Sequence, residues 1–213
     1  MRLTATTFVS LDGVLQSPGG PEEDPSSGFD LGGWLVPYVD EGFNEIAGGW
    51  FEDADAFLFG RKTYQILASH WPNVTDPQDQ GAAKLNGLPK YVATSTLTQL
   101  DWNNSHRLTG NLVEAISELK RQPGRALQVH GSGRLIQFLL QHELVDELRL
   151  LVFPVVLGKG QRLFEPGVVP GGWRLVSTRP TPSGVVGHAY EYAGKLAVGN
   201  IAVNADGKEE LQR

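Results

Sequence analysis

One stretch, residues 125–160, restricts the possible fold more than any other part of the chain. Residues 126–130 alternate as a short strand, and Gly131-Ser132-Gly133 interrupts that pattern. Leucine and isoleucine then recur at helical spacing between residues 134 and 142, and residues 145–157 alternate again as a long strand. The stretch therefore predicts a β-α-β unit.

The glycine turn inside this unit has two interpretations. Gly133 lets the backbone come close to a ligand, while Ser132 can cap a helix whose free N–H groups and dipole favour an anion. A phosphate group would be the natural ligand there. Alternatively, the glycines only make a tight turn between strand and helix, because a short Gly-x-Gly motif is a weak signal.

Composition excludes several classes of protein. A chain of 213 residues with 40% hydrophobic residues and no low-complexity linker indicates one domain with one sizeable core. The chain has no cysteine, which excludes disulfides, thiolate catalysis and cysteine-ligated zinc. Its five histidines lack the close spacing of a metal motif, so we expect no metal.

Charge and hydropathy narrow the expected partners. A net charge of −6 argues against a general nucleic-acid surface, so any anionic ligand needs a local cluster of basic residues. No apolar run reaches the roughly 18 residues of a membrane helix. The N-terminus enters a strand-like sequence without a signal peptide, which predicts a cytoplasmic protein with no membrane partner.

Two further strands are expected to end in groups that suit phosphate. A strand at residues 54–59 leads through Gly60-Arg61-Lys62-Thr63 into a helix, where two basic residues are unfavourable unless an anion shares the site. A strand at residues 89–94 ends in Thr94-Ser95-Thr96, whose hydroxyls either suit phosphate oxygens or cap the backbone. The carboxyl ends of parallel strands share one edge of a sheet, where ligands of α/β proteins bind.

The first strand, residues 3–10, ends in Ser10-Leu11-Asp12-Gly13. The carboxylate of Asp12 suits a ligand rich in hydrogen-bond donors, but an Asp-Gly turn is the alternative. Residues 16–33 are rich in Pro, Gly, Ser and acidic residues, and we expect them to form a lid over the site.

The other elements follow from hydrophobic periodicity. The second half of residues 34–51 and residues 111–121 are predicted as helices, and residues 71–87 as a loop. Asp40 and Glu41 lie in the first turn of the former helix, where acidic residues usually serve the helix dipole and only rarely donate a catalytic proton. Residues 173–179 and 185–192 are predicted as a hairpin.

The order of these motifs resembles the dihydrofolate-reductase-like superfamily over about residues 2–193, with Pro154-Val-Val-Leu-Gly158 after the long strand as a further match. The closest resemblance is to the reductase half of the bifunctional riboflavin-biosynthesis deaminase-reductase and its free-standing relatives. It implies a three-layer α/β fold, with a mainly parallel sheet of about eight strands, flanking helices and a C-terminal antiparallel hairpin. Residues 194–213 form a C-terminal extension beyond that domain.

The resemblance also implies NADPH as the hydride donor. It places Asp12 with Ser10 against the substrate, Asp12 as the catalytic residue, and Trp34 at the pocket border. The implied cofactor contacts are Gly60, Arg61, Lys62 and Thr63 at the 2′-phosphate and pyrophosphate, Thr94 and Ser95 at the adenosine end, and Gly131, Ser132, Gly133 and Arg134 at the pyrophosphate.

Three functions stay open. The first is a reductase of the 5-amino-6-(5-phosphoribosylamino)uracil type, which would need its deaminase as a separate protein because that half is absent. The second is a reductase of the same fold that acts on a dihydropterin or another small carbonyl or imine. Lys159 and Arg162 are the candidates for a substrate phosphate that would separate these two. The third is a nucleotide-binding module without turnover.

A homodimer is predicted, which would use the strand of residues 145–157 and the C-terminal extension. Pro154 cannot donate to a ladder, which indicates an edge or a bulge, so a partner or a hairpin must cover Phe153 and Val155. Residues 196–203 could pair with a sheet edge or a neighbouring chain, while residues 206–213 are expected to be a solvated end.

Overall fold

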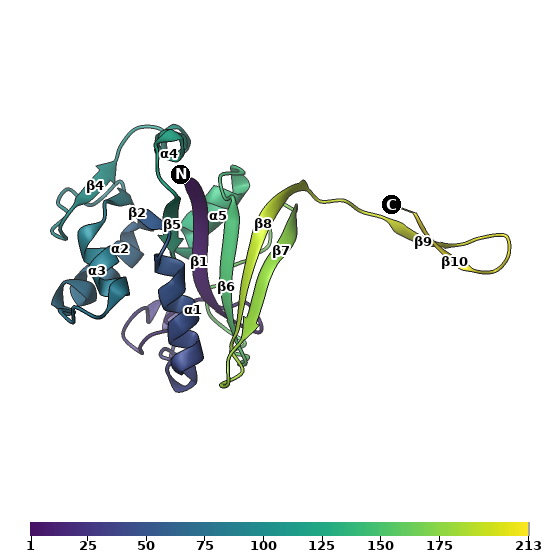
Figure 1. The fold of residues 1–213 in the computed structure, drawn as a ribbon, viewed down its shortest axis with the longest axis horizontal. Helices are drawn as coiled ribbons and strands as arrows, with labels where there is room; N and C mark the ends of the chain where they lie inside the picture. Colours follow the sequence, from purple (N-terminus) through teal and green to yellow (C-terminus); the bar gives the residue numbers. More distant parts are fainter. Residues whose placement is uncertain (213) are drawn as a thin grey trace.

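The computed structural model describes residues 1–212 and is built on an eight-stranded sheet with the strand order β4-β3-β2-β5-β1-β6-β8-β7 (Figure 1). Strands β1 to β6 are parallel to their neighbours, and the hairpin β7–β8 is antiparallel and attached to β6. The strands are β1 (Arg2–Ser10), β2 (Ala54–Gly60), β3 (Lys90–Ala93), β4 (Ser105–Leu108), β5 (Ala126–His130), β6 (Glu147–Phe153), β7 (Gly171–Pro180) and β8 (Val186–Lys195). The predicted fold class, including the hairpin, is confirmed.

Five α-helices cover the sheet: α1 (Glu41–Phe51), α2 (Arg61–His70), α3 (Gln80–Gly87), α4 (Leu112–Arg121) and α5 (Gly133–Gln141). Three short 3-10 helices lie in the connections: η1 (Ser26–Gly28), η2 (Val36–Tyr38) and η3 (Trp71–Asn73). Four of the five α-helices match the helices expected from periodicity to within a few residues.

The alternation of side chains along the strands divides the helices into two layers. Leu3 and Ala5 of β1 face one side, where they share a core with the apolar stripes of α4 and α5. Phe8 faces the other side and packs with Phe43 of α1, and on the same side Phe57 of β2 packs in a cluster with residues of α2 and α3. The interior strands are therefore buried on both faces, as a mostly parallel sheet requires, while the edge strands β4 and β7 are largely exposed.

Residues 71–87 were predicted as a loop, and this prediction is wrong. These residues contain η3 and α3 instead of a loop. The C-terminus of α3 depends on a residue outside it: the ammonium group of Lys90 donates to the carbonyl oxygens of Leu85 at 2.8 Å and Leu88 at 2.9 Å. Burial lowers the pKa of Lys90 to about 8. A fully buried lysine on β3 thus satisfies carbonyls that the helix leaves open.

Strand β6 is shorter than the predicted strand of residues 145–157, because it ends at Phe153, directly before Pro154. It is also an interior strand between β1 and β8. The side chain of Phe153 is covered within the chain by the rings of Trp34 and Phe43. The loop before η2 and helix α1 therefore cover Phe153, and β8 of the hairpin pairs with β6, so β6 offers no edge for dimerisation.

The C-terminal extension forms a separate two-stranded ribbon of β9 (Asn200–Val203) and β10 (Glu209–Gln212). Figure 1 shows this ribbon standing away from the body of the molecule beyond the end of β8. Residues 206–213 were expected to be a solvated end, and residues 206–212 are exposed although four of them form β10, while Arg213 lies outside the described residues. The ribbon leaves the body at the edge formed by β7 and β8.

Candidate functional site

The loops that follow β2 and β5 meet at the carboxyl edge of the sheet, because these two strands are neighbours. The hydroxyl of Ser132 accepts a hydrogen bond from the backbone N–H of Gly60 at 3.0 Å and donates one to Oγ1 of Thr63 at 2.6 Å. A Cβ atom at Gly60 would lie 3.0 Å from this hydroxyl. Two of the three predicted phosphate-compatible turns therefore form one junction, and the starts of α2 and α5 lie side by side.

Ser132 does not cap α5 as expected. It stands at the N-cap position, but its side chain makes no capping hydrogen bond, because it is engaged with α2 instead. Gly131 and Ser132 have φ angles of 60° and 61°, so two successive residues are left-handed at this turn. The first-turn N–H groups of α5 consequently have no side-chain cap and retain their preference for an anion.

Gly133 serves a packing contact. A Cβ atom there would lie 3.1 Å from Cδ2 of Leu15, in the loop after β1. This distance is tighter than most Cβ contacts, so a larger residue at position 133 would require Leu15 to shift. The close packing against Leu15 is a structural reason for a small residue here that is separate from any ligand.

Three basic side chains surround this junction. Arg61 is exposed, and its guanidinium group donates to Oε1 of Gln65 at 3.1 Å. Lys62 forms an ion pair with Asp24 at 2.6 Å and donates to Oγ of Ser26. Arg134 is exposed and has no ion-pair partner within residues 1–212. It also borders a small cavity of about 90 Å³ that is lined by Gly133, Arg134, Gln137, Gln161, Arg162 and Glu165.

The predicted lid, residues 16–33, is fastened to the neighbouring elements. The side-chain amide of Gln16 donates to the carbonyl oxygens of Asp24 at 2.9 Å and Ser26 at 3.0 Å. The indole N–H of Trp34 donates to the carbonyl oxygen of Gln16 at 2.8 Å. The Lys62–Asp24 ion pair ties the same loop to α2. Trp34 itself is buried in the core under this loop.

Asp12 uses both carboxylate oxygens inside the chain. Oδ1 accepts from the hydroxyl of Ser10 at 2.7 Å and from the N–H of Leu157 at 3.0 Å. Oδ2 accepts from the N–H of Gly158 at 2.9 Å and from the guanidinium group of Arg162 at 3.2 Å. The N–H of Leu157 and these other donors hold the pKa of Asp12 well below its usual range. Asp12 thus binds the distant turn of Leu157 and Gly158 and not its own backbone, and the role of Ser10 and Asp12 in substrate binding stays a prediction.

In the turn after β3, the hydroxyl of Thr94 caps the backbone, which was the alternative to phosphate binding. Oγ1 of Thr94 accepts from the N–H groups of Thr96 at 3.2 Å and Leu97 at 3.1 Å, so it caps the local backbone. Ser95 is exposed next to it. Because β3 pairs with β2, this turn continues the same edge of the sheet beyond Gly60.

Sequence reasoning missed His130, the last residue of β5. Its ring stacks on Phe51 of α1 with the centroids 4.7 Å apart, and its Nε2 lies 2.9 Å from Oε1 of Gln128. The amide nitrogen of Gln128 already donates to the carbonyl oxygen of Trp50 and to Asp53. Nε2 of His130 must therefore carry the proton, which leaves Nδ1 as an acceptor. Its only signal in the sequence was its position directly before the glycine turn.

Burial, together with the nearby positive charge of Arg149, lowers the pKa of His130 to about 3. Arg149 is held by Asp53 at 2.6 Å and by Glu147 at 2.5 Å. Thr6 lies opposite both His130 and Arg149 in the strand register, and its buried hydroxyl has no hydrogen-bond partner within the described part of the chain. A neutral histidine therefore lies at the carboxyl end of β5 near neutral pH.

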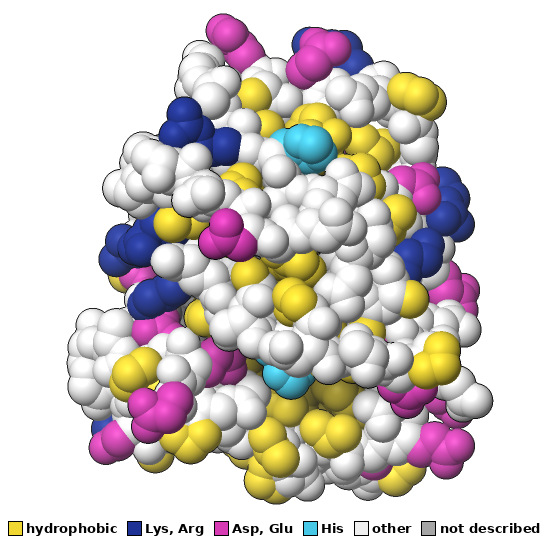
Figure 2. All heavy atoms as spheres, turned by 90° about the vertical axis from the view of Figure 1, so that its left-hand side faces the viewer, with side chains coloured by type: hydrophobic (Ala, Val, Ile, Leu, Met, Phe, Trp, Pro, Cys, Tyr) yellow, Lys and Arg dark blue, Asp and Glu magenta, His cyan; other side chains and the backbone are white. Residues whose placement is uncertain are grey.

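The molecular surface on the side of β4 and α3 is hollowed near its lower end (Figure 2). Hydrophobic side chains and a histidine are visible in the hollow, and lysine and arginine side chains gather along one margin of the same face. A shallow apolar floor with a basic margin suits a ligand that has an aromatic ring and an anionic group.

The depressed pKa of His130 makes stability depend on pH. The unfolded chain takes up this proton near pH 6.5 and the folded chain only near pH 3, so stability falls as the pH decreases through that window, by at most about 1.4 kcal/mol per unit. We expect the melting temperature to fall between pH 7 and pH 5, and the His130→Gln variant to show a smaller fall. The exposed His106→Gln variant is the control. Equal pH profiles of wild type and His130→Gln would contradict this assignment.

The sheet order, the antiparallel hairpin and the junction at the carboxyl edge define a dihydrofolate-reductase-like α/β protein. The model of the family described as the RibD C-terminal domain matches residues 2–187, and the chain belongs to this family. The fold is thus of the riboflavin-type reductase kind.

Individual relatives agree with this placement. The uncharacterized protein YyaP of Bacillus subtilis (strain 168) is 29% identical over 195 residues, which cover 91% of this chain and 96% of that protein. A putative riboflavin biosynthesis protein from Shewanella sp. PV-4 has a TM-score of 0.64 at 22% identity, covering 90% of this chain and 99% of that one. Dihydrofolate reductase from Enterococcus faecalis, complexed with NADP(H), has a TM-score of 0.57 at 15% identity, covering 90% and 96%.

Residues 1–212 contain neither a metal-binding group of side chains nor a membrane-spanning helix. Within residues 1–212, no three His, Asp or Glu side chains are grouped so that they could hold a metal ion. Within the same residues, no helix is both long enough and apolar enough to cross a membrane.

Proposed function

We propose that this protein is an NADPH-dependent reductase of the riboflavin-biosynthesis type. The observation that carries the proposal is the junction of Gly60, Thr63 and Ser132, which brings the starts of α2 and α5 together. Each helix start favours an anion, and each carries an exposed arginine in its first turn, Arg61 or Arg134. Such a pair of anion sites fits a dinucleotide with several phosphates, although the whole chain is acidic.

The cofactor would supply the hydride, and the chain would bind and orient it. Arg134 and the N–H group of Gly133 would hold the pyrophosphate, while Arg61 and Lys62 would bind the 2′-phosphate. The turn of Thr94 and Ser95 would border the adenosine end. Lys62 would then share its charge between the phosphate and Asp24, which would connect cofactor binding to the loop of residues 16–33.

The substrate would lie at the carboxyl end of β5, beside the junction of Gly60, Thr63 and Ser132. There Nδ1 of His130 is an acceptor for a ring N–H group, and the stacked Phe51 offers an apolar edge. Trp34 would border this pocket from the core side. Asp12 would act as a positioning residue, because its four hydrogen bonds fix the turn of Leu157 and Gly158 beside Ser10.

A second candidate substrate class is favoured by one observation. The two candidate residues for a substrate phosphate are both engaged, Arg162 with Asp12 at 3.2 Å and Lys159 with Asp30 at 2.5 Å. A reductase of the same fold that takes an unphosphorylated pterin, imine or carbonyl would leave these pairs intact. The riboflavin-type substrate would have to displace at least one of them.

An assay of NADPH oxidation tests the proposal and separates the two classes. The loss of reduced-nicotinamide absorbance is followed with a phosphoribosylaminopyrimidine, with its dephosphorylated form and with a dihydropterin. We expect substrate-dependent oxidation, and a strong preference for one of the two pyrimidines would decide the role of the phosphate. Cofactor binding without oxidation by any substrate of these classes would favour a nucleotide-binding module.

A further inference from the structure

The C-terminal ribbon has one apolar face that nothing covers. Ile201 and Val203 alternate on β9, and Leu211 of β10 pairs directly with Ile201, so all three project from the same side. Their exposed fractions are 65%, 70% and 62%. Glu209 pairs with Val203 and shares this face at its end, while the opposite face carries Ala202 and Glu210. An isolated two-stranded ribbon is at best marginally stable in water, so this one needs a surface to pack against.

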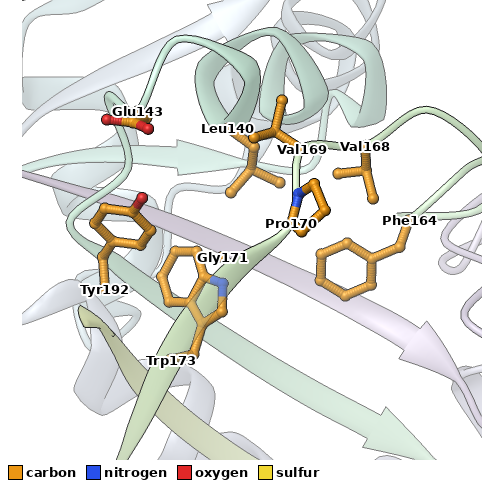
Figure 3. Close-up of a pocket in the computed structure, with 9 residues that line it drawn as sticks. All are labelled: Leu140, Glu143, Phe164, Val168, Val169, Pro170, Gly171, Trp173 and Tyr192. Carbon is orange, nitrogen blue, oxygen red and sulfur yellow. The ribbon is translucent and has the colours of Figure 1, made fainter. Parts of the chain in front are cut away.

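A matching surface lies where the ribbon begins. A cavity of about 260 Å³ opens between the end of α5 and the start of β7. In Figure 3, Trp173 and Tyr192 form one side and Phe164 with Val168 the other, while Glu143 stands at the rim. The lining is mostly apolar and consists of Leu140, Glu143, Phe164, Val168, Val169, Pro170, Gly171, Trp173 and Tyr192.

The groove continues along the free edge of the sheet. β7 is the terminal strand, and Leu175 and Val176 on it are each about half exposed. Arg174 and Arg179 of β7 are already paired, with Glu191 and Glu45. The two surfaces therefore match through their exposed apolar side chains.

The direction of the ribbon favours the groove of another copy over its own. Gly171, at the start of β7, pairs with Lys195, the last residue of β8, so the groove and the root of the ribbon share one corner. From this corner the ribbon extends away from its own body (Figure 1). A two-fold axis beside the corner would bring each root next to the partner's groove, so that both ribbons are bound at once and the assembly closes.

We propose that residues 196–212 form an exchanged arm, which packs its apolar face into the groove and along β7 of a second copy of this chain. β7 has ten residues and spans roughly 33 Å, long enough to receive a four-residue ribbon and its connecting segment. In this arrangement the second copy covers the apolar side chains of the ribbon, which would be an aggregation hazard in a monomer. The proposal does not depend on the proposed reductase activity.

Cysteine cross-linking tests the arm directly, because the chain contains no cysteine of its own. The double variant Ile201→Cys with Val169→Cys places one thiol on the arm and one in the groove, both on exposed side chains. Under mild oxidation we expect a covalent dimer on a denaturing gel. The pair Ile201→Cys with Val36→Cys, on the distant η2, is the control. An internally linked monomer, or no more dimer than in the control, would overturn the proposal.

Sedimentation of variants without cysteine gives a second measurement. We expect the wild-type chain to sediment at about twice 23.2 kDa at micromolar concentration. The double variant Ile201→Glu with Val203→Glu should dissociate at least about tenfold more readily and remain folded, because both side chains are exposed in the single chain. Val36→Glu should leave the dimer intact. A monomeric wild type, or a dimer that the arm variant does not weaken, would overturn the proposal.

Discussion

Replacing Arg134 by glutamate is expected to lower the affinity for NADPH by at least about 100-fold, or roughly 2.7 kcal/mol. Arg134 lies in the first turn of α5, where Ser132 leaves the helix uncapped, and it has no ion-pair partner within residues 1–212. One charge-assisted contact contributes about 1.5–3 kcal/mol, and a carboxylate would in addition repel the pyrophosphate. Because Arg134 is exposed, folding should be unaffected. A titration followed by cofactor fluorescence measures the change.

The matched control for this variant is Arg121→Glu. Arg121 ends α4, at the opposite edge of the sheet, just before the chain enters β5. The Arg121→Glu substitution changes the net charge by the same amount, so it measures the long-range effect of charge on the binding of an anionic ligand. We expect its NADPH affinity to stay within about threefold of wild type. An equal loss in both variants would show that Arg134 does not contact the cofactor.

The Asp12→Asn variant is expected to lose both stability and turnover. An amide keeps one acceptor oxygen, but its NH₂ group would face the N–H of Gly158 or Leu157, which are themselves donors. Losing hydrogen bonds to a charged acceptor costs about 1.5–3 kcal/mol, which lowers the melting temperature of a chain of this size by roughly 3–12 °C. The turn of residues 157–162 should become more mobile, and turnover should fall at least about tenfold.

Two measurements separate positioning from direct substrate contact. If Asp12 acts through the turn, the Arg162→Gln variant should reproduce part of both losses, because Arg162 binds the same carboxylate at 3.2 Å. Asp30→Asn, which removes an exposed carboxylate from the neighbouring loop, is the control and should leave the melting temperature almost unchanged. An Asp12→Asn variant with wild-type melting temperature and little turnover would instead support the catalytic role.

The sequence predicted the sheet well because its interior strands are buried on both faces. β2 is a short apolar run that ends in glycine, while β1 and β5 alternate and lead to Asp12-Gly13 and to the glycine turn, and their order indicated the β-α-β arrangement. Prediction failed where stability comes from a distant residue. α3 has a weak apolar stripe and two glycines, and Lys90 stabilises its end from β3. β4 is an exposed edge strand of mostly polar residues, without the alternation that marks a half-buried strand.

In the candidate site, too, features with a local sequence pattern were predicted and contacts between distant residues were not. Periodicity and turn chemistry located the junction of Gly60, Thr63 and Ser132, because strand ends in a parallel sheet meet at one edge. The partners of individual side chains could not be predicted. Asp12 binds a turn that lies about 145 residues further along the chain, and the tautomer of His130 depends on what Gln128 contacts. Such pairings follow from tertiary packing and leave no local pattern in the sequence.

The most direct test of the central claim is a calorimetric titration of the wild-type protein and the Arg61→Ala variant with NADPH and with NADH. We expect the wild type to bind NADPH at least about tenfold more tightly than NADH, because Arg61 and Lys62 stand at the start of α2 for the additional phosphate. Arg61→Ala should weaken NADPH binding by roughly 1.5–3 kcal/mol and NADH binding much less. A wild-type protein that binds neither nucleotide, or equal losses for the two nucleotides in Arg61→Ala, would contradict the account.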